Sequence, residues 1–339
     1  MSHLNPSIKD KVSFRPREAK PLEYYVDGIT KKRDYYILSE AITLLESERL
    51  EHRDLAQKIL KACYPIRAQS FRFGITGTPG VGKSTFIDRV VSELIQDGKP
   101  AGILTIDPSS VDGRGSILGD KTRMEALSKQ HKVFIRPSPS KRFLGGIHQF
   151  TFEAIIMCEA AGIESIFVET VGTGQSEVDV SDTTDATIVL ILPGSGDSLQ
   201  GIKKGILEKA DLLVIHKADG ERKDLADQSV RDLRKGLHFS KGTIETPVVV
   251  FSSSTGHNKE KLLESLDTIV GRKLKHLKAT RKKQENKWLE NRVTQHIQEE
   301  ARRKLDDSNH LAEQPTNKSE SPFHAFESLK KNIDIKIKR

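Results

Sequence analysis

Cysteine and long hydrophobic runs are scarce in this sequence. Its two cysteines, Cys63 and Cys158, are too few for a disulfide framework and lack the spacing of a metal-binding cluster, so we expect two buried, inert thiols. The longest apolar run, Ala186 to Leu192, is far too short to cross a bilayer. No hydrophobic stretch lies in the first twenty residues, and Asp10 and Glu18 interrupt the basic residues there. These features argue against a secretory signal and a mitochondrial presequence, and they predict a cytoplasmic protein without membrane contact.

The positive charge is confined to one segment. The net charge is +8, from 55 basic and 47 acidic residues among 339. Residues 271–305 hold twelve Lys or Arg against four Glu, which equals the excess of the whole chain. Because the rest of the chain is near neutral, we do not expect a nucleic-acid-binding protein.

The chain divides into five segments by composition and periodicity. Prolines and mixed charge near the start indicate a loosely ordered arm, and helical spacing of apolar residues before Tyr64-Pro65 predicts a helical hairpin. A polar linker and a short amphipathic tail end the chain. The predicted segments are a flexible arm at 1–30, a helical segment at 31–68, a nucleotide-binding domain at 69–270, a basic helical arm at 271–305, and the linker and tail at 306–339.

Short apolar runs alternate with helical ones through the central domain. The predicted strands are Phe71–Thr76, Gly102–Asp107, Val133–Arg136, Ser165–Thr170, Thr187–Leu192, Leu212–His216 and Val248–Ser252. Helices are predicted at about 84–97, 120–130, 148–161, 199–209, 222–237 and 258–270. Apolar strands joined by helices predict an α/β fold, with a mostly parallel sheet covered by helices on both faces. Ligands of such sheets bind at the carboxyl ends of the strands.

The stretch from Phe71 to Thr85 carries the most specific motif. It fits G-x-x-x-x-G-K-[ST], the phosphate-binding loop (P-loop) of nucleoside triphosphatases, with a strand-like run before it and a helix-like run after it. In this context a mere glycine-rich turn is the weaker interpretation. Backbone N–H groups of the loop would point at phosphate oxygens, and the positive end of the next helix would add to their field. The expected nucleotide-binding residues here are Gly77, Thr78, Pro79, Gly80, Val81, Gly82, Lys83, Ser84 and Thr85.

Acidic residues after two predicted strands suit a magnesium ion. Mg²⁺ requires hard oxygen ligands and keeps several waters, so the Ser84 hydroxyl with Asp107 is a sufficient protein contribution. The alternative for Asp107 is a turn before Pro108. Asp120 lies in the glycine-rich segment 112–124 and could reach the metal through water if that segment is a switch loop. The composition of the segment alone indicates only a surface loop.

Glu169-Thr-Val-Gly172 ends the fourth predicted strand, in the place of the D-x-x-G element of many GTPases. Glu169 could bond a metal-bound water, and the Gly172 N–H could sense the outermost phosphate. Gln175 is a candidate for orienting the attacking water. With Lys83, these three residues form the expected catalytic set.

A base-reading element ends the sixth predicted strand. His216-Lys-Ala-Asp219 resembles N-K-x-D, with His216 in place of Asn. Asp219 would accept two hydrogen bonds from guanine, each contributing about 1.5–3 kcal/mol, whereas adenine would leave the carboxylate unpaired. Lys217 would lie along the base, and Ser252 and Ser253 could offer backbone N–H groups to the base carbonyl.

Taken together, these residues resemble the MeaB-type GTPases, whose animal member is the methylmalonic aciduria type A protein and which older names call ArgK. The resemblance covers roughly residues 35–305 and includes Gln284 and Trp288 of the basic arm. Its most specific stretches are Gly77–Thr85, Asp107–Met124, Ile135–Ser140, Cys158–Gly162, Val168–Glu177 and Leu192–Gly205.

The resemblance implies binding and slow hydrolysis of GTP with Mg²⁺. It also implies that the protein escorts a cobalamin-dependent acyl-CoA mutase and gates the loading of adenosylcobalamin into it. Asp107, Asp120, Glu169 and Ser84 would then surround the metal, and the basic arm would form a homodimer. The residues implied to couple nucleotide state to the mutase are Arg123, Asp197, Gln200 and Lys203.

Three alternatives stay open. A kinase-like ATPase associated with arginine or ornithine transport is disfavoured by Asp219, and a metal-delivery GTPase by the lack of a Cys-x-x-Cys or His-rich strand. A nucleic-acid-binding ATPase would have to use the basic arm.

No arginine finger stands at a fixed place in the sequence, so we expect slow hydrolysis that a partner stimulates.

Overall fold

The computed structural model describes residues 20–107, 124–139, 150–170, 179–194, 204–238 and 246–307. The chain splits into two compact units, one up to Leu277 and the other from Lys278 onward. The first unit contains the sheet and the helices around it. In the second unit, the described part is a single helix.

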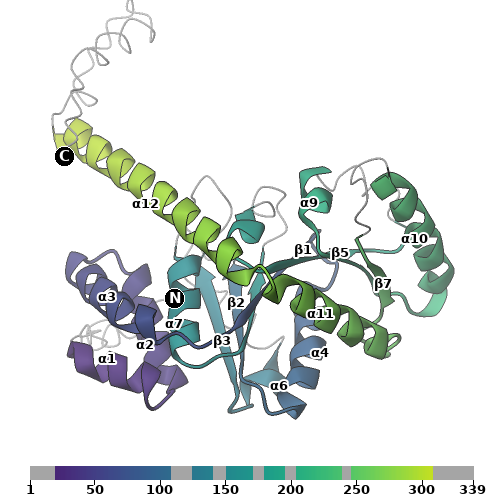
Figure 1. Ribbon diagram of the computed structural model, residues 1–339, viewed down its shortest axis with the longest axis horizontal. Helices are drawn as coiled ribbons and strands as arrows, with labels where there is room; N and C mark the ends of the chain where they lie inside the picture. The colour runs from purple at the N-terminus through teal and green to yellow at the C-terminus, as the bar shows by residue number, and fades with distance from the viewer. Residues whose placement is uncertain are drawn as a thin grey trace, which may run out of the picture. The chain divides into compact units, whose positions relative to one another are not determined.

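A parallel sheet, with seven strands in the described part of the chain, forms the centre of the first unit (Figure 1). The strand order is β3-β2-β4-β1-β5-β6-β7, so β1 lies between β4 and β5. All seven predicted strands are confirmed, with ends that differ by at most a few residues. Their bounds are β1 Phe71–Gly77, β2 Ala101–Asp107, β3 Val133–Pro139, β4 Ser165–Glu169, β5 Ala186–Ile191, β6 Leu212–His216 and β7 Val248–Phe251.

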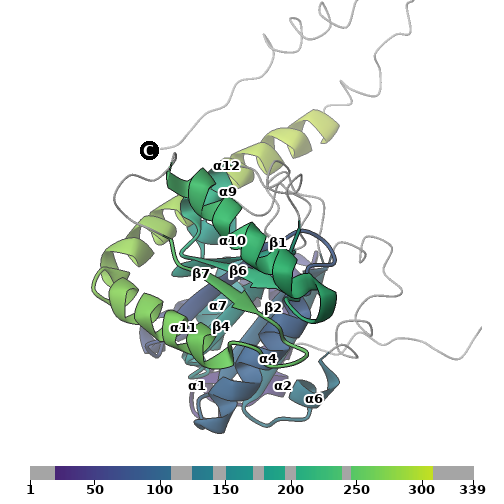
Figure 2. The same cartoon turned by 90° about the vertical axis from the view of Figure 1, so that its right-hand side faces the viewer.

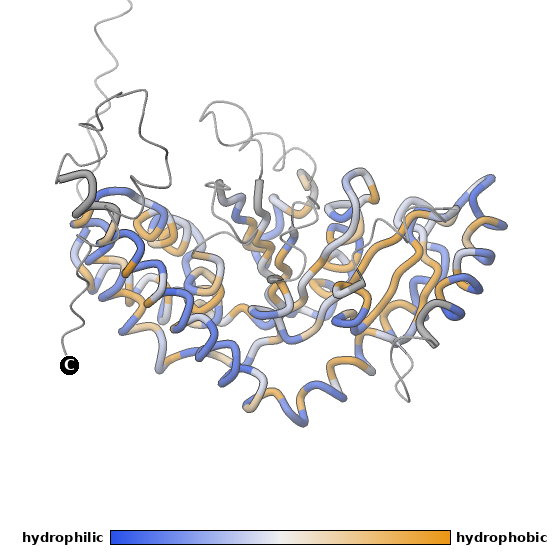
Figure 3. Tube along the Cα trace, turned by 90° about the horizontal axis from the view of Figure 1, so that it is seen from above, coloured by the Kyte–Doolittle hydropathy of each residue, from blue (hydrophilic) through white to orange (hydrophobic). Residues whose placement is uncertain are grey.

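Helices cover both faces of the sheet, as predicted (Figure 2). On one face, α4 (Lys83–Gln96), α6 (Glu125–Ser128) and α11 (Lys259–Leu274) enclose the larger hydrophobic core with alternate strand residues such as Phe73 and Ile188. On the other face, α9 (Lys204–Lys209) and α10 (Lys223–His238) enclose a second core with Val189 and Leu213. Figure 3 shows hydrophobic residues along the strands and hydrophilic ones on the outer sides of the helices.

The amino-terminal helices pack onto α7 (Thr151–Ala160), all of whose residues are buried. The predicted helical segment is confirmed as α2 (Tyr35–Glu46) and α3 (Leu50–Cys63), which a short 3-10 turn, η2 (Tyr64–Ile66), follows. Asp34 caps α2, because its side chain accepts hydrogen bonds from the N–H groups of Tyr36 and Ile37. Both thiols are buried as expected, and burial raises the pKa of Cys63 to about 11.

The prediction of a loosely ordered arm is wrong for residues 22–30, which form α1 (Leu22–Thr30). Tyr25 and Ile29 lie one helical turn apart and are both buried. Gly28 lies on the same side, close against Ile37 of α2. The apolar pattern is too short to stand out beside the prolines, but packing against α2 and α3 stabilises the helix.

Short 3-10 turns complete the described part of the first unit, and the described part of the second unit is helical. The turns η4 (Asp179–Asp182) and η5 (Gly220–Arg222) precede β5 and α10. The helix α11 continues to Leu274, beyond its predicted end, and α12 (Leu277–Asp307) confirms that the basic arm is helical. Within the described ranges, no helix combines the length and the apolar character that crossing a membrane requires.

A buried ion pair joins the strand that leads into the phosphate loop to α7. Arg72 Nε donates to Glu159 Oε1 over 2.8 Å, and these side chains are 1% and 0% exposed. Ser70 Oγ donates to the same oxygen at 2.6 Å. On the other side of β1, the Arg72 N–H donates to Asp185 Oδ2 at 2.9 Å. These bonds fix the start of β1 between Glu159 of α7 and Asp185, the residue before β5.

We predict that Glu159→Ala lowers the free energy of unfolding by about 3–5 kcal/mol, because it removes a carboxylate from a buried guanidinium. Urea unfolding followed by circular dichroism measures the change. Lys209→Ala is the control, since it breaks the half-exposed Lys209–Asp182 pair and should lower that free energy by less than about 1 kcal/mol. Equal losses in the two variants would contradict a stabilising role for the buried Arg72–Glu159 pair. A further variant, Glu159→Gln, separates the effect of lost charge from that of lost volume.

Candidate functional site

The phosphate loop connects β1 to α4 at the carboxyl edge of the sheet. A Cβ on Gly77 would lie 2.5 Å from the Leu190 carbonyl oxygen of the neighbouring β5, so only glycine fits there. Lys83, the first residue of α4, folds its side chain back, and its Nζ donates to the Gly77 carbonyl at 2.9 Å. The side chain is 7% exposed. The loop therefore holds its lysine amine beside N–H groups at a helix start, which together favour an anion.

The other predicted residues of the loop lie in the same turn. Thr78, Pro79 and Gly80 follow β1, and the Val81 N–H donates to the Thr78 carbonyl at 3.2 Å. Thr85 lies in the first turn of α4.

A hydroxyl and a carboxylate meet beside the phosphate loop. Ser84 Oγ donates to Glu169 Oε1 at 3.0 Å, and Glu169 is the last residue of β4, next to β1. Asp107 ends β2 at the same edge, two positions beyond the register partner of Glu169, and its side chain lies outside the described part. Two hard oxygen donors within hydrogen-bonding distance of each other suit Mg²⁺, so the residues present fit the predicted metal.

Two consecutive residues at the end of β6 hold the phosphate loop from the other side. Lys217 Nζ donates to the Gly80 carbonyl at 2.8 Å, and His216 Nδ1 lies 2.7 Å from the Val81 carbonyl. The His216 ring is 1% exposed, and its Nε2 lies 2.7 Å from Ser253 Oγ. Burial lowers the pKa of His216, and the nearby Lys217 lowers it further, against the opposing effects of the Val81 hydrogen bond and Asp219.

The predicted guanine reader is held by serines that follow β7. Ser254 Oγ donates to Asp219 Oδ2 at 2.7 Å, and the hydroxyls of Ser254 and Ser252 lie 2.9 Å apart. Ser252 and Ser253 were predicted to lie here, whereas Ser254 was not, although the run of three serines is visible in the sequence. Asp219, which follows β6, is therefore joined by hydrogen bonds to the segment after β7 that carries both predicted serines.

The structure thus brings most of the predicted site together. Hydrogen bonds link the phosphate loop to Glu169 on one side and to residues 216–219 and 252–254 on the other. The remaining predicted residues lie outside the described part of the chain. They are Asp120, Arg123, Gly172, Gln175, Asp197, Gln200 and Lys203.

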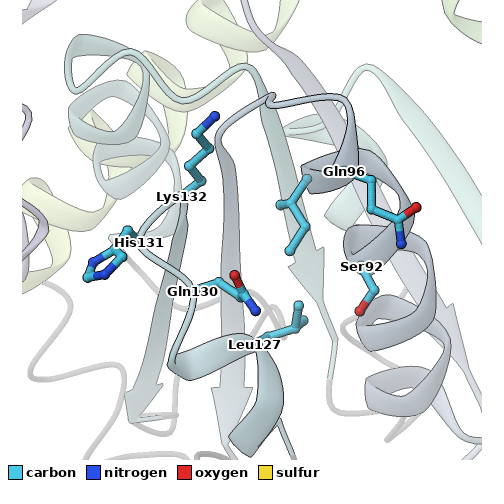
Figure 4. A pocket seen from close by; sticks show the side chains of 7 residues that line it. Ser92, Gln96, Leu127, Gln130, His131 and Lys132 are labelled. Carbon is cyan, nitrogen blue, oxygen red and sulfur yellow. The ribbon is translucent and has the colours of Figure 1, made fainter.

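A separate hollow of about 530 Å³ lies at the opposite end of α4 (Figure 4). It opens between the last turns of α4 and the segment that leads into β3. Its lining residues are Ser92, Ile95, Gln96, Leu127, Gln130, His131 and Lys132, and the predicted site residues are not among them. The hollow is therefore distinct from the phosphate loop.

Substitution of Gly82 can test the contact between the phosphate loop and His216. Its φ is +96°, and a Cβ there would lie 2.8 Å from His216 Cε1, whereas Gly80 has φ +78° and open space around it. Both Gly→Ala changes incur left-handed strain of about 1–2 kcal/mol. We predict that Gly82→Ala lowers the free energy of unfolding by about 1–3 kcal/mol more than Gly80→Ala does, because the His216 ring must move. Equal losses in the two variants, measured by urea unfolding, would contradict this contact.

The family model described as Methylmalonyl Co-A mutase-associated GTPase MeaB matches residues 38–306. GTPase ArgK of Escherichia coli (strain K12) is 48% identical over 184 residues, which cover 54% of this chain and 56% of that protein. The mitochondrial methylmalonic aciduria type A homolog of Mus musculus is 39% identical over 282 residues, which cover 77% of this chain and 67% of that protein.

The solved structure of an LAO/AO transport system kinase superposes with a TM-score of 0.70 at 28% identity, and covers 92% of this chain and 97% of that one. These findings confirm the resemblance, the P-loop α/β fold and the GTPase assignment. Because the family model spans well over half of its length, the chain belongs to the MeaB family of methylmalonyl-CoA mutase-associated GTPases.

Proposed function

We propose that this GTPase is a slowly hydrolysing chaperone that gates the loading of adenosylcobalamin into an acyl-CoA mutase, such as methylmalonyl-CoA mutase, and protects that enzyme. The observation that carries the proposal is one continuous hydrogen-bonded group. It runs from Glu169 through Ser84 and the phosphate loop to the base-reading residues 216–219. We place Glu169 beside the outermost phosphate and residues 216–219 beside the base. Both ends of this group therefore act on the same loop.

The chemistry at the phosphate end is positioning and charge neutralisation. The Lys83 amine would bind the outer phosphates, and Ser84, Asp107, Asp120 and Glu169 would hold Mg²⁺. When bound, the metal neutralises charge that develops on the phosphate oxygens. Glu169, Gly172 and Gln175 are proposed to position water and to report the outermost phosphate.

The base end is proposed to read guanine through Asp219. The Ser254 hydroxyl donates to Oδ2 of this carboxylate and so orients it. Lys217 lies with its amine on the Gly80 carbonyl, so its aliphatic stem runs between the phosphate loop and β6. We place the base along that stem, with Ser252 and Ser253 beside its carbonyl.

We predict that Asp219→Asn weakens GTP binding at least tenfold and creates tight binding to xanthosine triphosphate. An amide N–H donor matches the extra carbonyl of xanthine, whereas it opposes the amine of guanine, and each lost bond to a charged group weakens binding by about 1.5–3 kcal/mol. Isothermal titration calorimetry with both nucleotides gives the two dissociation constants. Asp232→Asn on the outer side of α10 is the matched control and should bind GTP as the wild type does. Unchanged GTP affinity in Asp219→Asn would refute this role.

The partner proposal is supported by the family and by the homologue named for methylmalonic aciduria type A. Arg123, Asp197, Gln200 and Lys203 are proposed to transmit the nucleotide state. Three of them follow Gly194 in the sequence, and the Gly194 N–H donates to Ser229 Oγ of α10 at 3.0 Å. A change at the base-reading residues just before α10 can therefore reach Gly194.

Capture from a lysate tests the partner. The protein loaded with a non-hydrolysable GTP analogue should retain a cobalamin-dependent mutase, identified by mass spectrometry. Lys83→Ala should lose nucleotide-dependent capture and cofactor loading. The control is Lys58→Ala, which changes an exposed lysine of α3. Loading of adenosylcobalamin that proceeds normally with Lys83→Ala would exclude the nucleotide switch.

A second candidate is a kinase-like ATPase associated with amino-acid transport. The similarity to the structure described as an LAO/AO transport system kinase favours it. Equal competition of ATP and GTP in the same titrations would support it over the chaperone. A cytoplasmic location, and the predicted bounds of the nucleotide-binding domain, the basic arm and the tail, also remain predictions.

We propose homodimerisation through α12. Leu289, Val293 and Ile297 recur every fourth residue and are 55%, 51% and 36% exposed, which gives this helix an apolar stripe. A second copy would bury the stripe. Val293→Lys should therefore convert a dimer to a monomer in light scattering after size exclusion, whereas Asn291→Lys, on another face of the helix, should not. A wild-type monomer would overturn this assignment.

A further inference from the structure

His216 occupies the place of the asparagine in the N-K-x-D pattern, and its ring connects two loops. Phe251 stacks on the ring with centroids 5.9 Å apart, and Phe86 meets it edge-on at 6.0 Å. The ring is 1% exposed. Both nitrogens are engaged within the protein, Nδ1 with the Val81 carbonyl and Nε2 with the Ser253 hydroxyl, each at 2.7 Å.

The partners determine which nitrogen carries the proton. A carbonyl oxygen only accepts, so Nδ1 must donate to Val81. In a neutral ring Nε2 then has no proton and accepts from the Ser253 hydroxyl. Burial and the neighbouring Lys217 lower the pKa of the ring, whereas the Val81 bond and Asp219 raise it, and the net direction is downward. The neutral ring is therefore the form that the site holds.

We propose that His216 is a positioning residue, and that the relay Val81–His216–Ser253 sets the position of the base-recognition loop relative to the phosphate loop. This inference rests on the proposed GTP binding. Both ring nitrogens are used inside the protein, so His216 gives no hydrogen bond to the base and acts through Ser253. The Ser253 hydroxyl becomes a determinant of nucleotide affinity, whereas guanine selectivity stays with Asp219.

Asparagine cannot replace both ends of this relay. Its amide nitrogen takes the position of Nδ1 and can keep the Val81 bond, but its side chain ends well short of Nε2. His216→Asn therefore removes the Ser253 bond from one side, and Ser253→Ala removes it from the other. These two variants and their combination form a double-mutant cycle for one hydrogen bond.

Calorimetric titration of GTP and GDP into the full chain tests the relay. Each single variant should weaken both nucleotides by about 2- to 10-fold, the range of one hydrogen bond, without changing the GTP-to-ATP ratio. The double variant should be no weaker than the weaker single variant. Ser265→Ala, which removes an α11 hydroxyl bonded to Lys261 of the same helix, should bind as the wild type does.

The ¹⁵N chemical shifts of the His216 ring test the tautomer without nucleotide. The Nδ1–H form should be present in the wild type, and its signals are assigned by their loss in His216→Asn. An Nε2–H tautomer, additive effects in the cycle, or Ser253→Ala binding as tightly as wild type would each overturn the relay. A wild type that binds no GTP would instead refute the proposed function, because the tautomer can still be measured. If His216→Asn does not fold, Ser253→Ala and the wild-type spectrum still decide.

Discussion

The outward-facing carbonyls of the phosphate loop impose the constraint on which this site depends. For a loop to aim its N–H groups inward at phosphate, its carbonyl oxygens must point outward and find donors elsewhere. Lys83 donates a hydrogen bond to the Gly77 carbonyl, Lys217 to that of Gly80 and His216 to that of Val81. Two of the three donors come from the end of β6, which also carries the base reader. The phosphate loop and the end of β6 are therefore held together as one piece.

The sheet topology makes this possible. In a parallel sheet the carboxyl ends of all strands meet at one edge, and β1 lies at the centre between β4 and β5. Glu169 and the phosphate loop are brought together by neighbouring strands, and His216 reaches the loop from one strand further away. A change at either end of the nucleotide can thus act on a shared loop, which is what a switch requires.

Much of the fold could be predicted from the sequence, because its strands are continuously apolar and its phosphate motif marks the turn between the first strand and the helix after it. The site residues at strand ends followed from the same argument. The helix α1 was missed because tertiary packing on α2, rather than a local pattern, stabilises it. The Arg72–Glu159 pair and the Ser254 bond to Asp219 join residues far apart in the chain, and a single sequence gives no signal for such pairs. The two-sided use of the His216 ring likewise depends on side-chain geometry that the motif does not contain.

The central claim is that this chain reads out a bound nucleotide for a partner and hydrolyses it slowly. The most direct measurement is the steady-state rate of GTP hydrolysis by the isolated protein and then with a cobalamin-dependent acyl-CoA mutase added. The account predicts turnover well below one per second alone, and a clear rise with the mutase, because we expect the partner to contribute charge stabilisation in the transition state. Hydrolysis at several per second by the isolated protein, unchanged by the mutase, would contradict it.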